Sequence, residues 1–329
     1  MGRLGLLACS GAAVFALAST ATAQEPAATV QGVTVTGTAK AASAAQQVER
    51  FAQIGGEGRL ARWYAPVCPV TTGLPSAFGS FVDQRIRSLA SEIGAPVAPV
   101  KCQANVLIMV TPTPNALANQ LVEQKAHALA GGRWPIDKTK LHAFADDQRP
   151  VRWLFSSHTA PIKGSTVATT LSNQAASVAS SSGGSMAGST LSGMFGGGTA
   201  LDGPPQYGNV FASRLIPAGD ESISQVVIVV DANRIAGLQA GQVADYLSMV
   251  TLAQARAEDR FAGIDTVLNL FAPDRDDAHR PAGLRPRDTA YLKALYRSDS
   301  QISYTAQVAG IATRLKSELA QKTGTDGGR

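Results

Sequence analysis

The amino-acid sequence predicts an exported α+β domain in which a mixed β-sheet packs against helices. A leader of signal-peptide type opens the chain. Short apolar runs bounded by Gly and Pro indicate strands, and longer segments with apolar residues at helical spacing indicate helices. The two kinds of element alternate irregularly along the 329 residues, which favours α+β over a doubly wound parallel sheet.

The first 23 residues have the charged, apolar and small-residue order of a secretory signal peptide. Arg3 carries the charge, residues 4–17 are apolar, and cleavage is expected after Ala23. The apolar run is shorter than the roughly 18 to 20 residues that span a bilayer, and no later stretch predicts a transmembrane segment. We therefore expect a periplasmic or secreted protein. Lipidation at Cys9, which follows Leu6-Leu7-Ala8, is the less favoured alternative because most of the apolar run lies after it.

Removal of the signal leaves two cysteines, Cys68 and Cys102. An even pair in an oxidising compartment predicts a disulfide, with two free buried thiols as the alternative. The loop between them is of a length for which chain entropy gives a stabilisation of about 3 to 4 kcal/mol.

Four segments of the first half follow in order. Residues 24–50 are small and polar, which predicts a flexible leader to a single domain over 51–322. Residues 62–70 are β-prone and predict a first strand. Apolar residues at helical spacing over 78–93 predict a helix that ends at Gly94. The apolar run within 102–111 predicts a buried strand.

The rest of the domain is predicted from the same signals. A helix over 115–130 and a strand over 151–157 precede a low-complexity Gly/Ser-rich segment over 172–208, expected to be a disordered loop. Order is expected to resume at 207–216, and Val226 to Val230 predict the strongest strand. The later segments are a helix over 238–253, helices over 286–297 and 302–321, and a disordered tail over 323–329.

The charge pattern excludes a nucleic-acid site. The net charge is +5, and basic and acidic residues are interspersed without a block of one sign. The histidines have no spacing that suits a shared metal, and the acidic pairs lack the further oxygen ligands that calcium requires. No cofactor is predicted.

One stretch of the second half has the order of elements found in zinc proteases. Such enzymes place two histidines one helical turn apart so that both reach one metal, with a glutamate between them to act on the bound water. A third histidine and a Met-containing turn extend the pattern. Residues 244–252 resemble the active-site helix, 265–271 resemble the Met turn, and 283–296 are similar to the closing helix of the metzincin group, with its Leu-x-x-x-Asp-x-x-x-Leu spacing.

The resemblance fails at the residues that perform the chemistry. Ala244 and Ser248 occupy the positions of the first two histidines, Gln254 that of the third, and Leu268 that of the methionine. Asp245 alone keeps the acidic character of the glutamate. Without imidazole ligands there is no reason for zinc to bind, and without zinc the acid has no activated water to serve. The resemblance therefore implies a zincin-like domain with vestigial metal positions.

Residues 63–110 resemble a family of secreted alphaproteobacterial proteins of unknown function with a protease-like fold. Together these features favour a non-catalytic binding or scaffold protein of the cell envelope that recognises an unknown envelope protein or peptide. The alternative is an exported hydrolase, peptidase-like, with Asp245 in a groove. A third hypothesis is a scaffold that docks through residues 180–203 or through the C-terminal helix. The oligomeric state is not predicted.

Overall fold

A computed structural model gives the fold. The structure describes residues 44–51, 59–130, 136–160, 220–255, 261, 263–272 and 279–326. The predicted signal peptide, most of the predicted leader and the segments 172–208 and 207–216 lie outside these residues. Contacts join the described residues into one compact unit.

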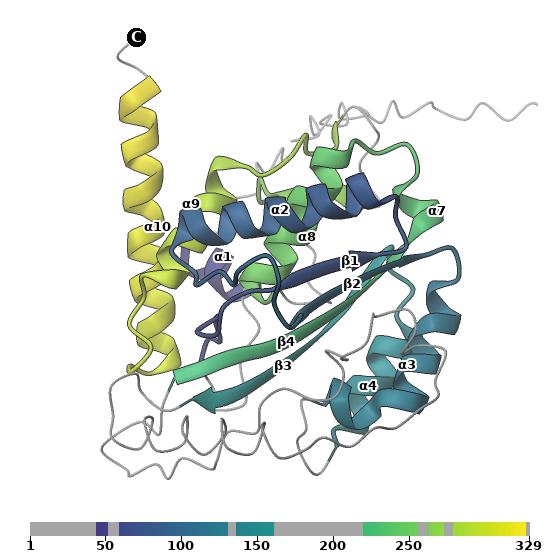
Figure 1. The fold of residues 1–329 in the computed structure, drawn as a ribbon. Helices are drawn as coiled ribbons and strands as arrows, with labels where there is room; N and C mark the ends of the chain where they lie inside the picture. The colour runs from purple at the N-terminus through teal and green to yellow at the C-terminus, as the bar shows by residue number, and fades with distance from the viewer. Residues whose placement is uncertain are drawn as a thin grey trace, which may run out of the picture. The chain divides into compact units, whose positions relative to one another are not determined.

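A mixed sheet of four strands forms the centre of the domain (Figure 1). β1 and β2 are parallel, β2 and β4 are parallel, and β3 runs antiparallel to β4 at the edge. The sheet and the helices packed on it confirm the predicted α+β class. In spatial order the strands are β1 (Pro69–Thr72), β2 (Val106–Thr111), β4 (Asp220–Asp231) and β3 (Val151–Ala160).

The helix α2 (Ser76–Ile93) connects the parallel strands β1 and β2, which need a crossover between them. Val82 and Ile86, from the predicted apolar stripe, are fully buried. The helix ends at Gly94, whose φ of 85° is left-handed, as is common at the C-terminal ends of helices. The predicted helix over 78–93 and its stop signal are therefore confirmed.

The turn from β1 to α2 passes very close to the neighbouring strand. Gly73 adopts a φ of 82°, and a Cβ atom there would lie 1.9 Å from the backbone oxygen of Val110. Only a glycine fits both the left-handed conformation and the close approach. By contrast, a Cβ atom at Gly94 would have open space around it.

Helices cover both faces of the sheet, so the strand residues alternate between two cores (Figure 1). In β2, Ile108 and Val110 face the larger core beside α2 and α8, while Leu107 and Met109 face a smaller core beside α3 and α4. This burial on both faces explains the continuous apolar run of the strand. The bounds of these helices are α3 (Pro114–Leu129), α4 (Lys138–Asp146) and α8 (Ala240–Ala253).

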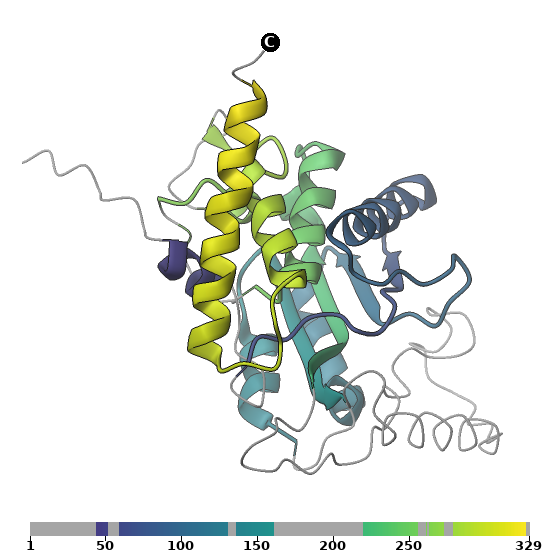
Figure 2. The same ribbon diagram turned by 90° about the vertical axis from the view of Figure 1, so that its left-hand side faces the viewer.

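The remaining elements extend the larger core. Figure 2 shows α10 in yellow alongside α9, and α1 also contacts α10. Phe51 of α1 is buried and its ring lies 4.8 Å from that of Tyr291 on α9. The elements are α1 (Ala44–Phe51), α7 (Ala232–Ile235), the 3-10 helix η1 (Val267–Phe271), α9 (Pro286–Tyr296) and α10 (Tyr304–Asp326).

The structure differs from the sequence-based boundaries in several places. α1 begins inside the segment expected to be a leader, and α10 continues into the expected tail. Residues 62–70 form isolated bridges at Arg62 and Val67, and the strand itself starts only at Pro69. One reason is that the Trp63 indole donates a hydrogen bond to the Thr251 carbonyl of α8 at 2.9 Å, which holds this segment against a helix.

The predicted disulfide is present. Cys68 and Cys102 are joined by an S–S bond of 2.01 Å, with their Cα atoms 6.2 Å apart. The bond links the residue before β1 to the loop before β2.

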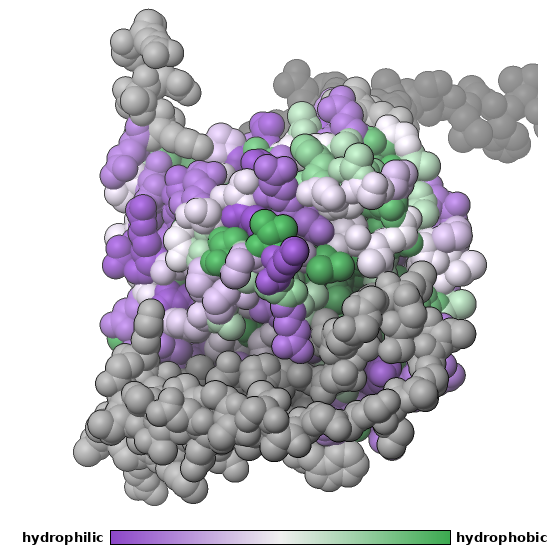
Figure 3. Space-filling model, in the orientation of Figure 1, coloured by the Kyte–Doolittle hydropathy of each residue, from purple (hydrophilic) through white to green (hydrophobic). Residues whose placement is uncertain are grey.

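On the face covered by α2, apolar patches are separated by hydrophilic side chains (Figure 3). Phe81 on α2 and Val100 in the loop before β2 are exposed large apolar residues. Isolated exposed apolar residues of this kind are ordinary for a globular surface. Within the part of the chain that the structure describes, no helix has the length and apolarity needed to cross a bilayer.

Candidate functional site

The helix α8 lies at the centre of the candidate site, in contact with α2, η1 and α9. Its start is closed by a capping box in which Gln239 N–H donates to Gln242 Oε1 at 3.0 Å. Residues 246–253 are all buried, so the helix is enclosed nearly all round. Its end is set by Gln254, which takes a left-handed φ of 48°.

The three positions predicted as vestigial metal positions are closed to solvent. Ala244 and Ser248 lie one helical turn apart and have no exposed surface, and Gln254 is 4% exposed. The Ser248 hydroxyl donates back to the Ala244 carbonyl at 2.7 Å, so its only hydrogen-bonding proton stays within the helix. The structure thus brings Ala244 and Ser248 together, with Gln254 beyond the end of the helix.

Asp245, the candidate for the hydrolase alternative, has both oxygens engaged within the domain. Oδ1 accepts a hydrogen bond from Arg85 Nε of α2 at 2.5 Å, and Oδ2 accepts one from the Leu284 N–H at 2.9 Å. The side chain is 13% exposed. A Cβ atom at Gly283 would lie 2.5 Å from Oδ2, so the chain passes close over the carboxylate. Asp245 therefore joins α2, α8 and the segment before α9.

The turn η1 lies directly beside α8. The rings of Tyr246 on α8 and Phe271 on η1 pack edge to face with centroids 4.9 Å apart. Below the turn, the Asn269 side chain is buried and its Nδ2 donates to the Ile264 carbonyl at 2.7 Å. Leu268, at the position where the resemblance would place a methionine, is also buried.

Asp288 connects η1 to the start of α9. One of its oxygens, Oδ2, accepts hydrogen bonds from Val267 N–H at 2.8 Å and from Arg285 N–H at 2.9 Å. The other oxygen is buried and has no hydrogen-bond partner among the described residues. Burial raises the pKa of the Asp288 carboxyl from 3.8 to about 6, against the opposing effect of the nearby Thr266 side chain and of the hydrogen bonds from the Arg285 and Val267 N–H groups. This is the central residue of the Leu284-x-x-x-Asp288-x-x-x-Leu292 spacing.

A second feature of the site is the outer edge of β3. The Asp231 N–H bonds to the Pro150 carbonyl at 2.8 Å, and this pair continues the register of β3 with β4. Because bonded and non-bonded pairs alternate in an antiparallel ladder, Val151, Trp153 and Phe155 direct their backbone N–H and C=O groups away from β4. Within the described ranges, no strand pairs with β3 on this outer side.

Contacts of the Trp153 side chain fix the position of β3 relative to α8. The Trp153 indole donates to the Ala255 carbonyl, just after the end of α8, at 2.9 Å. The Arg149 guanidinium lies over the Trp153 ring, 4.6 Å from its centroid. The register shifts between Ser156 and Ser157, so the regular part of the edge ends there.

The opposite edge of the sheet is much less available for pairing. β1 has only the residues Pro69–Thr72, and Pro69 has no N–H group to donate. The Thr71 hydroxyl donates a hydrogen bond to the Asp83 carboxylate of α2 at 2.7 Å, which holds β1 against this helix. A short edge strand with a proline is a usual protection against strand addition.

The sequence resemblance grouped the segments 244–252, 265–271 and 283–296, but it gave no role to Arg85, Gly283, Asp288 or the outer edge of β3. No local signal could have linked Arg85 to Asp245, since the two residues are 160 positions apart. Within the ranges that the structure describes, no three His, Cys, Asp or Glu side chains lie close enough together to hold a metal ion.

Comparison of the chain with protein-family models, curated proteins and solved structures finds no match. The fold and the site therefore define the class only as an α+β domain with an enclosed central helix and a sheet in which, among the described residues, no strand pairs with the outer side of β3.

Proposed function

We propose that this chain is an exported binding protein without catalytic activity, which captures an extended peptide segment of an envelope partner at the outer edge of β3. The observation that carries the proposal is the row of outward backbone groups at Val151, Trp153 and Phe155. Such a row is a template for one more strand, and main-chain hydrogen bonds to an extended peptide supply the affinity.

The order of elements supports a degenerate zincin-like frame. The enclosed helix α8, the turn η1 and the closing helix α9 follow one another along the chain, and α8 contacts both of the others. The strand expected at the edge before α8, residues 226–231, instead belongs to β4 and lies inside the sheet between β2 and β3. The positions for imidazole ligands hold Ala244, Ser248 and Gln254, none of which offers the donor that such a zinc site uses. A domain of this kind would retain a strand that can bind a peptide but would lack the metal site needed to hydrolyse it.

The charge of the chain favours a neutral or acidic peptide over a second copy of itself. The net charge is +5, so two copies repel each other, whereas an acidic segment is attracted. Arg149, just before β3, is ion-paired with the Asp147 carboxylate, so the pair adds little net charge at this end of the strand. The partner segment is therefore expected to be extended and neutral or acidic overall.

The experiment uses a matched pair of substitutions at one position. Phe155→Pro removes an outward N–H donor without taking a hydrogen bond from the ladder with β4. Phe155→Ala removes the same side chain but keeps that N–H. An extended acidic peptide selected from a displayed random library against the mature wild-type chain is the probe.

We expect the peptide to bind Phe155→Ala within about threefold of wild type and Phe155→Pro at least about tenfold more weakly, because hydrogen bonds to the added strand are lost. Amide hydrogen exchange should show new protection at Val151, Trp153 and Phe155 in the complex. Equal affinity for the two variants, or protection confined to other elements, contradicts the proposal. Pairing of two copies through β3, detected as a dimer by sedimentation, would assign the edge to self-association instead.

A further inference from the structure

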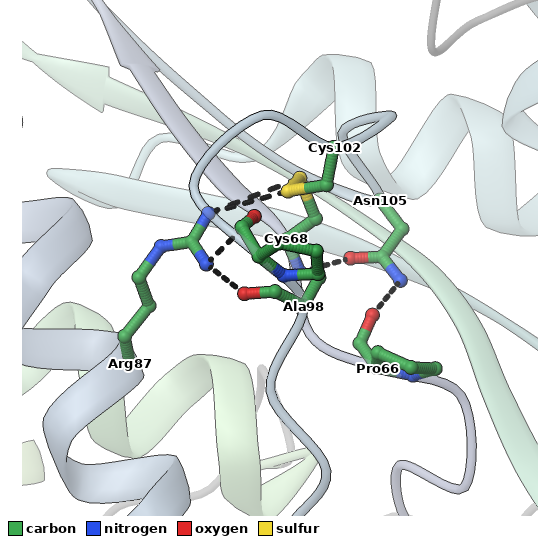
Figure 4. The surroundings of a disulfide bond; sticks show 7 residues. Pro66, Cys68, Arg87, Ala98, Cys102 and Asn105 are labelled. Atoms are coloured by element: carbon green, nitrogen blue, oxygen red, sulfur yellow. Dashed lines mark hydrogen bonds between the residues drawn. A yellow bond between two sulfur atoms is a disulfide. The ribbon is translucent and has the colours of Figure 1, made fainter.

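The disulfide lies against an arginine side chain from α2. Arg87 Nη2 is 3.3 Å from Cys102 Sγ and 4.0 Å from Cys68 Sγ (Figure 4). The other terminal nitrogen, Nη1, donates to the Ala98 carbonyl at 2.5 Å, which fixes the guanidinium beside the sulfur atoms. A guanidinium group at this distance stabilises a thiolate far more than it stabilises a neutral disulfide.

The two cysteine residues differ in exposure. Cys68 is buried, whereas Cys102 is half-buried in a loop whose neighbours Lys101 and Gln103 are exposed. Thiol exchange needs access to one sulfur and a stabilised thiolate leaving from the other. Cys102 is the more exposed partner, and Arg87 Nη2, although nearer to Cys102 Sγ, also lies 4.0 Å from Cys68 Sγ, the leaving sulfur.

We propose that Cys102 is an exchange site, at which an external dithiol reduces the Cys68–Cys102 bond with the help of Arg87. The incoming thiolate forms a bond to Cys102 Sγ while the Cys68–Cys102 bond breaks, and the electron pair leaves on Cys68 Sγ. The second thiolate of the reductant then attacks the reductant's other sulfur, which is bonded to Cys102 in the mixed disulfide. This step releases Cys102 as a thiolate beside Arg87. The dithiol loses two electrons and becomes a disulfide; one of its protons goes to Cys68 and the other to solvent.

Reduction at this site is local. Residues up to Ala98 are held by a backbone bridge in which Ala98 N–H donates to the Val67 carbonyl at 3.1 Å. On the other side, Asn105 accepts from Cys68 N–H at 2.8 Å and donates to the Pro66 carbonyl at 3.0 Å (Figure 4). Between these anchors, residues 99–104 are held by the disulfide and by Arg87. Exchange therefore releases one short loop, with Val100 at 89% exposure, and leaves the sheet intact.

The first test measures the reduction equilibrium of the mature chain in dithiothreitol buffers, with the oxidised fraction read by alkylation and mass. For Arg87→Gln, which removes the charge, we expect the equilibrium constant for reduction to fall about tenfold, which corresponds to about 30 mV for two electrons. Arg87→Lys keeps the charge and should stay within about threefold of wild type. Arg234→Gln removes an exposed arginine on α7 and should leave this equilibrium constant unchanged. A value for Arg87→Gln that equals wild type overturns the proposal.

The second test locates the exchange and does not depend on Arg87. The variants Cys68→Ser and Cys102→Ser each leave one thiol, and its rate of reaction with an aromatic disulfide reagent is followed by absorbance. We expect Cys102, in the Cys68→Ser variant, to react at least about tenfold faster than Cys68, with a pH midpoint that rises when Arg87→Gln is added. Equal rates, or a faster Cys68, overturn the assignment of Cys102.

Discussion

Replacement of Asp288 by asparagine should change how the stability of the domain depends on pH. The carboxyl group is fully buried, with one oxygen bonded to two backbone N–H groups and the other without a partner among the described residues. Its pKa is about 6 in the folded chain against 3.8 as the ordinary value, so the folded state favours the protonated form. The stability that this preference contributes is fully present below about pH 4 and is lost as the pH rises through 6.

The size of the effect follows from the difference between the two pKa values. The difference between the two pKa values corresponds to about 3 kcal/mol over the whole pH range, of which roughly 2.5 kcal/mol falls between pH 4 and pH 7. The asparagine side chain of the variant cannot ionise, although its buried amide adds a cost of about 1 to 3 kcal/mol that is independent of pH. The free energy of unfolding of Asp288→Asn, relative to wild type, should therefore rise by roughly 2.5 kcal/mol across this range.

Urea unfolding of both chains at pH 4, 5, 6 and 7 measures this difference. Because the other carboxylates titrate equally in both chains, their contributions cancel. Asp146→Asn, which removes an exposed carboxylate, serves as the control for the loss of one negative charge. A difference between Asp288→Asn and wild type that stays constant with pH would refute the reasoning that burial governs this group.

Three further predictions concern stability and metal content. Gly73→Ala should lower the free energy of unfolding by more than about 3 kcal/mol, because its Cβ would meet the Val110 backbone. Gly94→Ala should lower it by only about 1 kcal/mol in the same urea assay. Similar costs at the two positions would contradict this. Asp245→Ala and Gly283→Ala should each lower the free energy of unfolding by about 1 to 2 kcal/mol. In a double-mutant cycle, Gly283→Ala should destabilise the Asp245→Ala variant less than it destabilises wild type. Strict additivity of the two effects would argue against their close contact. Elemental analysis of the purified mature chain should find no stoichiometric zinc, and one tightly held zinc per chain would defeat the non-catalytic proposal.

Much of the fold could be predicted from local patterns. The stripe that includes Val82 and Ile86, with Gly94 as its stop, predicted α2 because spacing and capping are properties of adjacent residues. The apolar run of β2 was equally clear. The leader differs from the structure near its end, where α1 begins at Ala44 and Val48 is buried in the larger core, whose other residues come from distant parts of the chain.

The candidate site was predictable only as a set of elements. The spacing around Asp288 predicted a turn joined to a helix, and the structure has both in contact with α8. That Ala244 and Ser248 are closed to solvent, and that β3 lies at an edge, depends on the order of strands in the sheet, which is not a local property. The same reason explains why residues 62–68 are not a regular strand as predicted: Trp63 packs on α8, and only isolated bridges at Arg62 and Val67 form before β1 begins at Pro69.

The two edge strands of the sheet differ in how readily a further strand could pair with them. A domain with two unprotected edge strands can pair with further copies at both edges of its sheet, as happens when fibrils form. Here β1 has only four residues and begins with Pro69, which disfavours strand addition at that side of the sheet. Under the proposed function, the sheet would therefore gain a partner strand beside β3 and not beside β1.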